Sequence, residues 1–250
     1  MTNELKDHVA LVTGASRNIG RAICVELAKM GAHVVVHVGS DRDAAAETVS
    51  AIQKAGSTAS IVVGDLSDEA TANAIVAEAA KQYGRLDIIV NNAAIRPESK
   101  VADLAYSEWR KVMSVNLDSV FLVCKAALPY LENSPNAAIV NMGGLTGHSG
   151  AADRAHVIAS KAGVVGLTKA LAHDFGALNI TVNCVAPGLI ATERKAQAGK
   201  NPKHHDTRTN LLGRHGGTQE VADAVAFLCS TKARYITGET LHINGGAYLA

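Results

Sequence analysis

Hydrophobic and polar positions alternate along this chain in two patterns. Short runs rich in β-branched residues are typical of buried strands, and longer stretches with apolar residues three and four positions apart are typical of helices. Strands are predicted over residues 9–12, 33–38, 58–63, 86–91, 137–141, 180–185 and 240–243, and helices over residues 19–30, 44–55, 69–83, 106–131, 154–175 and 219–229. Asp68 and Thr218 precede two of these helices as expected N-caps.

The regular alternation of strand and helix indicates the fold class. Strands separated by helices are joined by right-handed crossovers, which makes the sheet parallel and places helices on both of its faces. The expected fold is an α/β, doubly wound, seven-stranded parallel sheet, and residues 1–250 contain no linker or repeat that would divide them into domains. Only residues 191–217 break the pattern, as a long, polar and irregular segment of the kind that is usually functional.

Composition narrows the class of protein without naming an activity. Hydrophobic residues make up 48% of the chain and the formal net charge is +1, so bulk charge attracts neither nucleic acid nor an anionic membrane. The N-terminus MTNELKDH lacks an apolar signal core, and no run approaches the length of a membrane span. Four scattered cysteines in apolar segments predict buried thiols in a reducing compartment, by default the cytoplasm.

The first predicted strand leads into a glycine-rich turn, residues 13–20 with the sequence TGASRNIG, and then into a helix. The N-terminus of a helix presents backbone N–H groups and a positive dipole end, both of which favour a phosphate. A glycine-rich turn is weak evidence alone, but after the first strand of a βαβ unit it has the setting that dinucleotide binding requires.

A second candidate region spans residues 139–166. A predicted strand breaks there into a loop with glycines at positions 143, 144, 147 and 150, and the loop enters a helix that carries Lys161. The neighbours of Lys161 (Ala159, Ser160, Ala162 and Gly163) are small, which leaves room for a cofactor beside the lysine stem.

These motifs together resemble the short-chain dehydrogenase/reductase family, close to its 3-oxoacyl carrier-protein reductase-like branch. TGASRNIG is similar to the family turn T-G-x-x-x-G-x-G, with Asn18 at the middle glycine, and asparagine is among the few residues that tolerate a positive φ. GDL at 64–66, NNAA at 91–94, NCVAPG at 183–188 and the tail from 213 to 246 resemble further family motifs, so the likeness covers nearly the whole chain. It implies a single Rossmann domain that binds a nicotinamide dinucleotide.

The resemblance also implies the cofactor contacts. In the family, Asp65 contacts adenine, residues 91–94 flank the cofactor, and residues 183–188 with Thr192 hold the nicotinamide carboxamide. The expected cofactor-binding residues are Gly14, Ser16, Arg17, Asn18, Ile19, Gly20, Ser40, Arg42, Asp65, Leu66, Asn92, Ala93, Lys161, Pro187, Gly188, Ile190 and Thr192.

The end of the second strand decides between the two nicotinamide cofactors. The acidic residue that binds the ribose 2′-OH of NAD would fall at Val38, which cannot do so. Arg17, with Ser40 and Arg42, could surround the 2′-phosphate of NADP, whereas Asp41 in the same loop argues against a phosphate. NADP(H) is therefore favoured over NAD(H).

The catalytic positions depart from the family pattern. The family uses a tyrosine as proton donor, a lysine four residues later, a serine thirteen residues before the tyrosine, and an asparagine in the preceding long helix. Asn116 and Lys161 match the asparagine and the lysine, but Val157 and Gly144 stand at the tyrosine and serine positions. Loss of general acid catalysis typically costs about 10²–10⁴-fold in rate, so the usual mechanism cannot operate.

Three interpretations remain open. A nearby side chain could supply the proton or hydrogen bond, with His148 and His156 as the weak candidates among a set that also includes Thr146, Ser149 and Asp153. Lys161, with a water held by Asn116, could act directly. Alternatively, the protein binds nucleotide without redox turnover and has a regulatory, structural or non-redox role. The function expected first is oxidoreduction of a 3-oxoacyl or related ketone substrate.

Residues 191–217 would by resemblance form a lid over the substrate. Its lysines, arginines and histidines favour an anionic substrate such as a carboxylate, a phosphopantetheine arm or a coenzyme A thioester, although a solvated loop explains the charges equally well. His204, His205 and Asp206 lack the spacing of a metal site, so no metal is expected. Family members are commonly homotetramers that pair helices 106–131 and 154–175.

Overall fold

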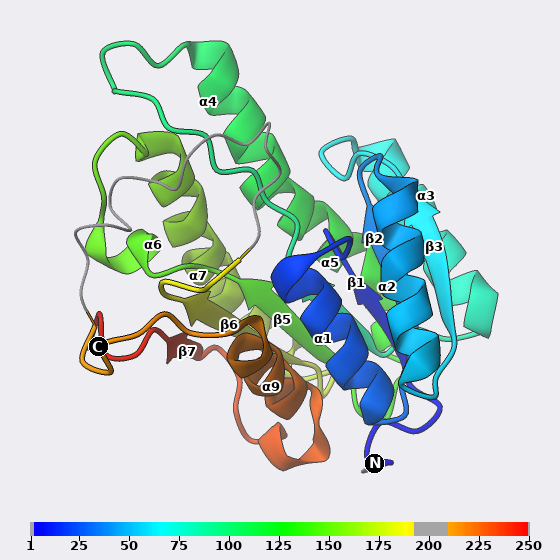
Figure 1. Ribbon diagram of the computed structural model, residues 1–250. Helices are drawn as coiled ribbons and strands as arrows, with labels where there is room; N and C mark the ends of the chain where they lie inside the picture. The colour runs from blue at the N-terminus through cyan, green and yellow to red at the C-terminus, as the bar shows by residue number, and fades with distance from the viewer. Residues whose placement is uncertain (1–2, 193–209, 250) are drawn as a thin grey trace.

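The computed structural model describes residues 3–192 and 210–249. Seven parallel strands form one sheet in the order β3-β2-β1-β4-β5-β6-β7 (Figure 1). The strands are β1 (Val9–Val12), β2 (His33–Val38), β3 (Ala59–Val63), β4 (Ile88–Asn91), β5 (Ala138–Met142), β6 (Thr181–Pro187) and β7 (Thr240–Ile243). The doubly wound α/β Rossmann architecture predicted from the alternating pattern is confirmed.

Helices cover both faces of the sheet (Figure 1). The helical elements of the described residues are α1 (Asn18–Lys29), α2 (Arg42–Lys54), α3 (Glu69–Tyr83), α4 (Tyr106–Met113), the π-helical turn η1 (Ser114–Asp118), α5 (Ser119–Leu131), α6 (Thr146–Ser149), α7 (Ala155–Gly176), α9 (Thr218–Cys229) and the 3₁₀ turn η3 (Thr231–Ala233). The strand order reverses between β1 and β4, which opens a crevice at the carboxyl ends of these strands.

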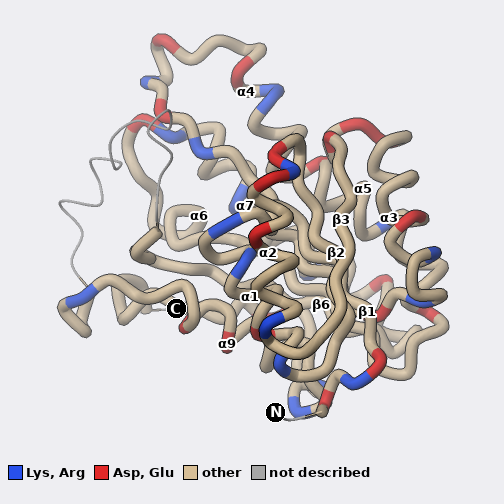
Figure 2. The backbone as a smooth tube through the Cα atoms, turned by 45° about the vertical axis from the view of Figure 1, so that its right-hand side comes forward, with Lys and Arg blue, Asp and Glu red and all other residues tan. Residues whose placement is uncertain are grey.

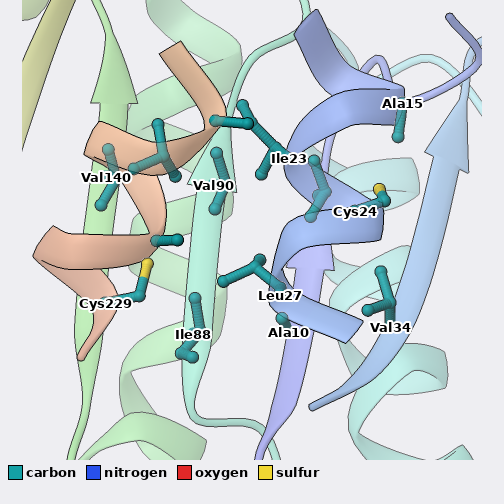
Figure 3. Close-up of a cluster of buried hydrophobic side chains, with 14 of the residues drawn as sticks. Ala10, Ala15, Ile23, Cys24, Leu27, Val34, Ile88, Val90, Val140 and Cys229 are labelled. Carbon is teal, nitrogen blue, oxygen red and sulfur yellow. The ribbon is translucent and has the colours of Figure 1, made fainter. Parts of the chain in front are cut away.

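Two hydrophobic clusters, one on each face, hold the layers together. Alternate residues of a strand point to opposite faces, so Ala10 and Val12 belong to the cluster beneath α1, α2 and α9, while Val9 and Leu11 belong to that beneath α3, α5 and α7. Figure 3 shows the first cluster, where Leu27 of α1 lies between the helix and the strands. Burial of a leucine of this kind stabilises the fold by about 1.5–3 kcal/mol.

Asp87 fastens the amino-terminal edge of β4. Its buried carboxylate accepts the Val9 N–H at 2.8 Å, the Arg85 guanidinium at 2.7 and 2.8 Å, and the Ser134 hydroxyl at 2.5 Å. Burial raises the pKa of Asp87, but the hydrogen bonds from Arg85, Ser134 and Val9 outweigh it, so the pKa lies below its usual value. One ionised side chain thus ties β1, β4 and the loop before β5.

The structure confirms one of the two predicted helix caps and corrects the other. Asp68 caps α3 as expected, accepting the Thr71 N–H at 2.8 Å. Thr218, however, is the first residue of α9 rather than its cap: Gly217 is the N-cap, and its N–H donates to the Glu220 carboxylate at 2.7 Å. The carboxylate three residues into the helix therefore performs the capping that was assigned to the threonine hydroxyl.

The helix predicted over residues 106–131 is present with these bounds, but it is not α-helical throughout. It is interrupted by the π-helical turn η1. Judged by length and composition alone among the described residues, Tyr106–Leu131 contains an 18-residue window that is apolar enough to cross a membrane. The expectation that no run approaches a membrane span was wrong on this measure. Apolar side chains of this run, such as Val123 and Leu131, are fully buried beneath the sheet beside α3.

Charged side chains of both signs are scattered over the helices (Figure 2). Several form ion pairs, including Arg21 with Glu47 at 2.7 Å and Lys125 with Glu69 at 3.0 Å. Such exposed pairs contribute little stability, about 0–1 kcal/mol each. Blue and red positions are interspersed along the backbone in Figure 2.

Candidate functional site

A cavity of about 740 Å³ opens at the carboxyl ends of the strands. Loops that follow six of the seven strands contribute to its wall, together with the start of α1 and one face of α7. The residues that line it are Gly14, Ser16, Arg17, Asn18, Ile19, Gly20, His37, Gly39, Gly64, Asp65, Leu66, Ser67, Asn92, Ala93, Ala94, Ile95, Arg96, Val115, Ser119, Met142, Gly143, Gly144, Leu145, Thr146, Arg154, Val157, Lys161, Pro187, Gly188, Leu189, Ile190 and Thr192.

The glycine-rich turn forms the wall between β1 and α1. Gly14 has a φ of +61°, and a Cβ placed on it would lie 2.7 Å from the Cα of Ala93. A Cβ on Gly20 would lie 2.5 Å from the carbonyl oxygen of Gly14, so neither position accepts a larger residue. Asn18 adopts a φ of +48°, as its place at the middle glycine requires. The turn therefore keeps the close backbone approach of a phosphate-binding loop at the N-terminus of α1.

The turn is held by the loop that follows β4. The side-chain amide of Asn92 donates to the carbonyl oxygens of Thr13 and Gly14, both at 2.9 Å. In return, the Thr13 hydroxyl oxygen accepts the N–H groups of Asn92 at 2.9 Å and Ala93 at 3.0 Å. These four bonds satisfy polar groups across the crevice and fix its width.

His37, at the end of β2, was not among the predicted residues. Its Nδ1 accepts the Gly14 N–H at 3.3 Å and its Nε2 lies 3.0 Å from the Gly64 carbonyl oxygen, an arrangement that suits the neutral ring with a proton on Nε2. Burial lowers the pKa of His37, and the Gly64 bond and the charge of Asp65 offset this only in part. No local sequence pattern marks this residue, because both of its partners are distant in the chain.

Residues predicted around the 2′ position of the ribose are divided by the structure. Arg17 lines the cavity, but its guanidinium pairs with Asp41 at 2.9 Å. Ser40 and Arg42 do not line it, because the chain turns into α2 at Arg42. Asp65, Leu66 and the predicted residues after β6 (Pro187, Gly188, Ile190 and Thr192) all line the cavity.

Lys161 lies on the wall opposite the glycine turn. It is buried, and its Nζ donates to the Met142 carbonyl oxygen at 2.6 Å. Burial, followed by the nearby positive charge of Arg96, lowers the pKa of Lys161 to about 7. Gly144 and Val157 line the same part of the cavity, and a Cβ placed on Gly144 would meet no atom within 4 Å.

Asn116 supports this wall from behind. It lies in the π-helical turn, and its carboxamide accepts the Ile95 N–H at 2.8 Å and donates to the Ile95 carbonyl at 2.9 Å. It also donates to the Ser160 hydroxyl at 3.2 Å, next to Lys161. Asn116 is fully buried and does not itself line the cavity. Its direct contacts fix the loop after β4 against α7.

The structure does not bring the two histidine candidates into the cavity. His156 is fully buried on another face of α7, where its Nε2 lies 3.5 Å from a carboxylate oxygen of Glu108 on α4. His148, on α6, packs against His242 and Tyr248, with its ring centroid 4.5 Å from the His242 ring centroid and 5.5 Å from the Tyr248 ring centroid. Neither histidine lines the cavity, whereas Thr146 does.

Comparison with known proteins agrees with this geometry. The family model described as enoyl-(acyl carrier protein) reductase matches residues 14–248. The 3-oxoacyl-[acyl-carrier-protein] reductase FabG of Staphylococcus aureus (strain Mu50 / ATCC 700699) is 37% identical over 240 residues, 96% of this chain and 98% of the relative. FabG of Escherichia coli (strain K12) is 37% identical over 241 residues, 96% of this chain and 97% of the relative.

Solved structures match over almost the full length. A short-chain dehydrogenase from Burkholderia cenocepacia J2315 in complex with NADP has a TM-score of 0.91 and 33% identity, covering 98% of this chain and 99% of that one. A variant of a Serratia marcescens short-chain dehydrogenase/reductase has a TM-score of 0.90 and 34% identity, with coverage of 98% and 99%. The chain belongs to the short-chain dehydrogenase/reductase family.

The cavity of this short-chain dehydrogenase/reductase fits a nicotinamide dinucleotide. The cradle at Gly14 and Gly20, which a Cβ would fill, can hold the diphosphate at the N-terminus of α1. A Cβ on Gly188 would lie 2.7 Å from the Cα of Asn244, so the wall after β6 also depends on a glycine. Within residues 3–192 and 210–249, no three His, Cys, Asp or Glu side chains gather as metal ligands. His204, His205 and Asp206, and most of the predicted lid, lie outside the described residues.

Two arginines of the wall were missed from the sequence. Arg154 is the N-cap residue of α7 and is only 4% exposed, and Arg96 follows β4. Arg154, Val157 and Lys161 are spaced at i, i+3 and i+7, which places them along one face of the helix. That spacing could have marked Arg154 as facing the cavity once Lys161 was assigned to it.

Proposed function

We propose that this protein is an NADP(H)-dependent reductase of a 3-oxoacyl or related ketone substrate in which Lys161 supplies the proton. The observation that carries the proposal is the composition of the wall around Lys161. Gly144 and Val157, which the resemblance places at the family's serine and tyrosine positions, line the cavity and carry no hydroxyl group. Lys161 lines it too, and its ammonium is the acid with a pKa near 7 on this wall.

The cofactor is proposed to lie along the loops after β1, β4 and β6. The glycine turn would hold the diphosphate, Asp65 and Leu66 the adenosine, and Thr192 with residues 187–190 the nicotinamide end. Preference for NADP(H) is supported by the buried Val38 at the position of the NAD-binding acid and by the NADP bound to the Burkholderia relative. The Arg17–Asp41 ion pair would have to rearrange, or share Arg17, to accept a 2′-phosphate.

The proton is proposed to move as follows. A reduced nicotinamide, when bound, would supply the hydride for the carbonyl carbon of the substrate. The developing alkoxide oxygen takes a proton from the Lys161 ammonium, which becomes the neutral amine and is reprotonated from solvent. A lysine with a pKa near 7 divides its time between the two forms at neutral pH, which suits general acid–base catalysis in both directions. Asn116 acts as a positioning residue, because it links Ile95 to Ser160, the residue that precedes Lys161 in α7.

The alternative is a nucleotide-binding protein without redox turnover. The absence of hydroxyl side chains at positions 144 and 157 favours this alternative, because the wall around Lys161 then lacks the family's proton donor. Thr146 is the hydroxyl residue of the loop after β5 that lines the cavity, and it remains a candidate for holding the substrate oxygen. His148 and His156 lie outside the cavity and are therefore weaker candidates than Thr146.

The proposal also covers the oligomeric state, the cellular location and the substrate of the protein. We expect a cytoplasmic homotetramer that pairs α4–α5 and α7 with copies of themselves, and the exposure of Tyr106 (76%) and Phe121 (46%) on the first of these helices is consistent with such contacts. Residues 191–217 would cover an acyl-thioester or small ketone substrate. No nucleic-acid or membrane partner is proposed.

Anaerobic single-turnover assays test the function. NADPH absorbance is followed after mixing with a panel of ketones and 3-oxoacyl thioesters, and NADPH and NADH affinities are measured by fluorescence. We expect consumption whose rate falls about tenfold per pH unit above pH 7, as Lys161 loses its proton. Lys161→Arg should keep a cation but lose this pH dependence together with most of the rate. Measurable NADPH binding with no consumption of any substrate would establish the alternative.

A further inference from the structure

The end of the cavity beside Lys161 is lined by three cationic side chains: Arg96, Arg154 and Lys161. Arg96 is close enough for its charge to lower the pKa of Lys161. Among the described lining residues the one carboxylate is Asp65, on the loop after β3 at the adenosine end. The remaining lining cation, Arg17, is paired with Asp41. Three of the four described Lys and Arg side chains that line the cavity are therefore gathered at the end where the substrate would react.

We propose that Arg96 and Arg154 form a carboxylate-binding subsite, so that the substrate is a short oxo acid or hydroxy acid with a free carboxylate rather than a thioester. This inference rests on the proposed function and names its substrate class. A guanidinium has five N–H donors in a planar fork, which match the two oxygens of a carboxylate. Both arginines have partners within the protein, and this number of donors allows one group to hold a partner and a ligand together.

The position of Arg154 favours a substrate with a carboxylate over a substrate with a thioester. Arg154 is 4% exposed and lies inside the cavity, on the face of α7 that also carries Lys161. Seven residues of helix separate the two backbones by about 10 Å, and their long side chains can bring the charged groups closer. A substrate of a few carbons can bridge such a distance, with its carbonyl near Lys161 and its carboxylate at Arg154. The thioester group itself is neutral, so it offers a buried guanidinium one carbonyl acceptor but no negative charge and no pair of carboxylate oxygens.

Val157 separates the two polar positions. Its 2% exposed side chain lines the cavity one helical turn after Arg154 and one turn before Lys161. An apolar residue there offers contact to the carbon chain of a substrate between its two polar ends. The replacement of the family's phenol by Val157 is thus accompanied by a cation one turn earlier, on the same face.

A binding experiment tests the subsite without requiring turnover. The protein saturated with NADP⁺ is titrated calorimetrically with butanoate and with its neutral analogue butanamide, which are both unreactive. We expect butanoate to bind at least about tenfold more tightly, and Arg154→Gln or Arg96→Gln to weaken butanoate by about 10- to 100-fold with little change for butanamide. Arg154→Lys should retain part of the affinity. Arg110→Gln, an exposed residue of α4 outside the cavity, is the matched control.

Arg154 begins α7, so the thermal stability and NADPH affinity of its variants are measured alongside. Arg96 lies in a loop. If Arg154→Gln does not fold, the butanoate and butanamide affinities of Arg96→Gln are used to test the subsite. Equal binding of butanoate and butanamide overturns the proposal. Carboxylate binding that folded Arg96 and Arg154 variants leave unchanged also overturns it.

A kinetic comparison separates this proposal from the proposed function. NADPH consumption is measured with 3-oxobutanoate and with its methyl ester, and Arg154→Gln should raise KM for the acid about tenfold or more while leaving KM for the ester unchanged. Arginine-dependent butanoate binding without NADPH consumption keeps the subsite and rejects the reductase function. Consumption of the ester as readily as the acid keeps the function and rejects the subsite.

Discussion

Replacement of Lys161 by methionine should stabilise the apoprotein at neutral and acidic pH. The pKa of this buried lysine falls from 10.5 to about 7 on folding, so the folded state binds its proton about 4–5 kcal/mol more weakly than the unfolded state. Methionine removes that penalty and fills a similar volume. It also removes the bond to the Met142 carbonyl, at a cost of about 1 kcal/mol. The net gain at pH 6 is therefore about 4 kcal/mol.

The sign of the pH dependence provides the sharper test. Between pH 7 and pH 10.5 the unfolded lysine is protonated and the folded one is neutral, so the wild type gains stability as the pH rises, by about 1.4 kcal/mol per unit. The variant lacks this contribution. The difference in free energy of unfolding between variant and wild type should therefore shrink across this range. Near pH 10 it should disappear or reverse, because the cost of the lost hydrogen bond to Met142 does not depend on pH.

Urea unfolding of both proteins at equal concentration, from pH 6 to pH 10, measures this difference. Other titrating groups contribute equally to the two proteins and cancel when one free energy of unfolding is subtracted from the other. Lys81→Met, on the exposed surface of α3, is the control and should give a flat difference. A Lys161→Met difference that does not change with pH would refute the conclusion that the ammonium is desolvated.

Three further predictions address the site and the fold. Gly144→Ser with Val157→Tyr should raise generic ketone reduction by about 10²–10⁴-fold in the single-turnover assay, because the Gly144 position has open space for a side chain; no gain would indicate a cavity shaped for other chemistry. NADPH affinity should fall below pH 6.5 as His37 becomes protonated and loses the Gly14 bond, and His37→Gln should remove this dependence in fluorescence titrations. Asp87→Ala should lower the free energy of unfolding by about 3–5 kcal/mol at pH 7 in urea, and a loss below 1 kcal/mol would contradict its role as a buried anchor.

The fold could be predicted because each strand and long helix carries its own periodic signal. Elements without such a signal were missed. The four-residue helix Thr146–Ser149 is too short to show a period, and a π-helical turn has the same composition as the α-helix around it. The helices α1 and α9 begin one residue before the predicted positions, since their N-cap residues, Arg17 and Gly217, make no side-chain cap hydrogen bond that the sequence could signal.

The cavity loops that carry family motifs were predicted better than the wall around Lys161. Motif residues such as Gly14 and Asp65 line the cavity because they lie in the short turns that directly follow β1 and β3, and the local sequence determines those turns. Arg96, Arg154 and His37 belong to no motif, and only the packing of α7 and of the strand ends brings them together. Arg42 shows the reverse error: a charge close to the site in sequence is directed away by the start of α2.

The π-helical turn has a consequence for the chain length that this fold tolerates. A π turn contains one residue more than an α turn, and each residue advances the helix by about 100°. The segment Ser114–Asp118 is thus equivalent to a one-residue insertion that the packing of α4, α5 and α7 has absorbed. Deleting one residue there should yield an uninterrupted α-helix rather than a broken one. The deletion would turn Asn116 away from Ile95, so a continuous α-helix and the support of the loop after β4 by Asn116 are alternatives in this sequence.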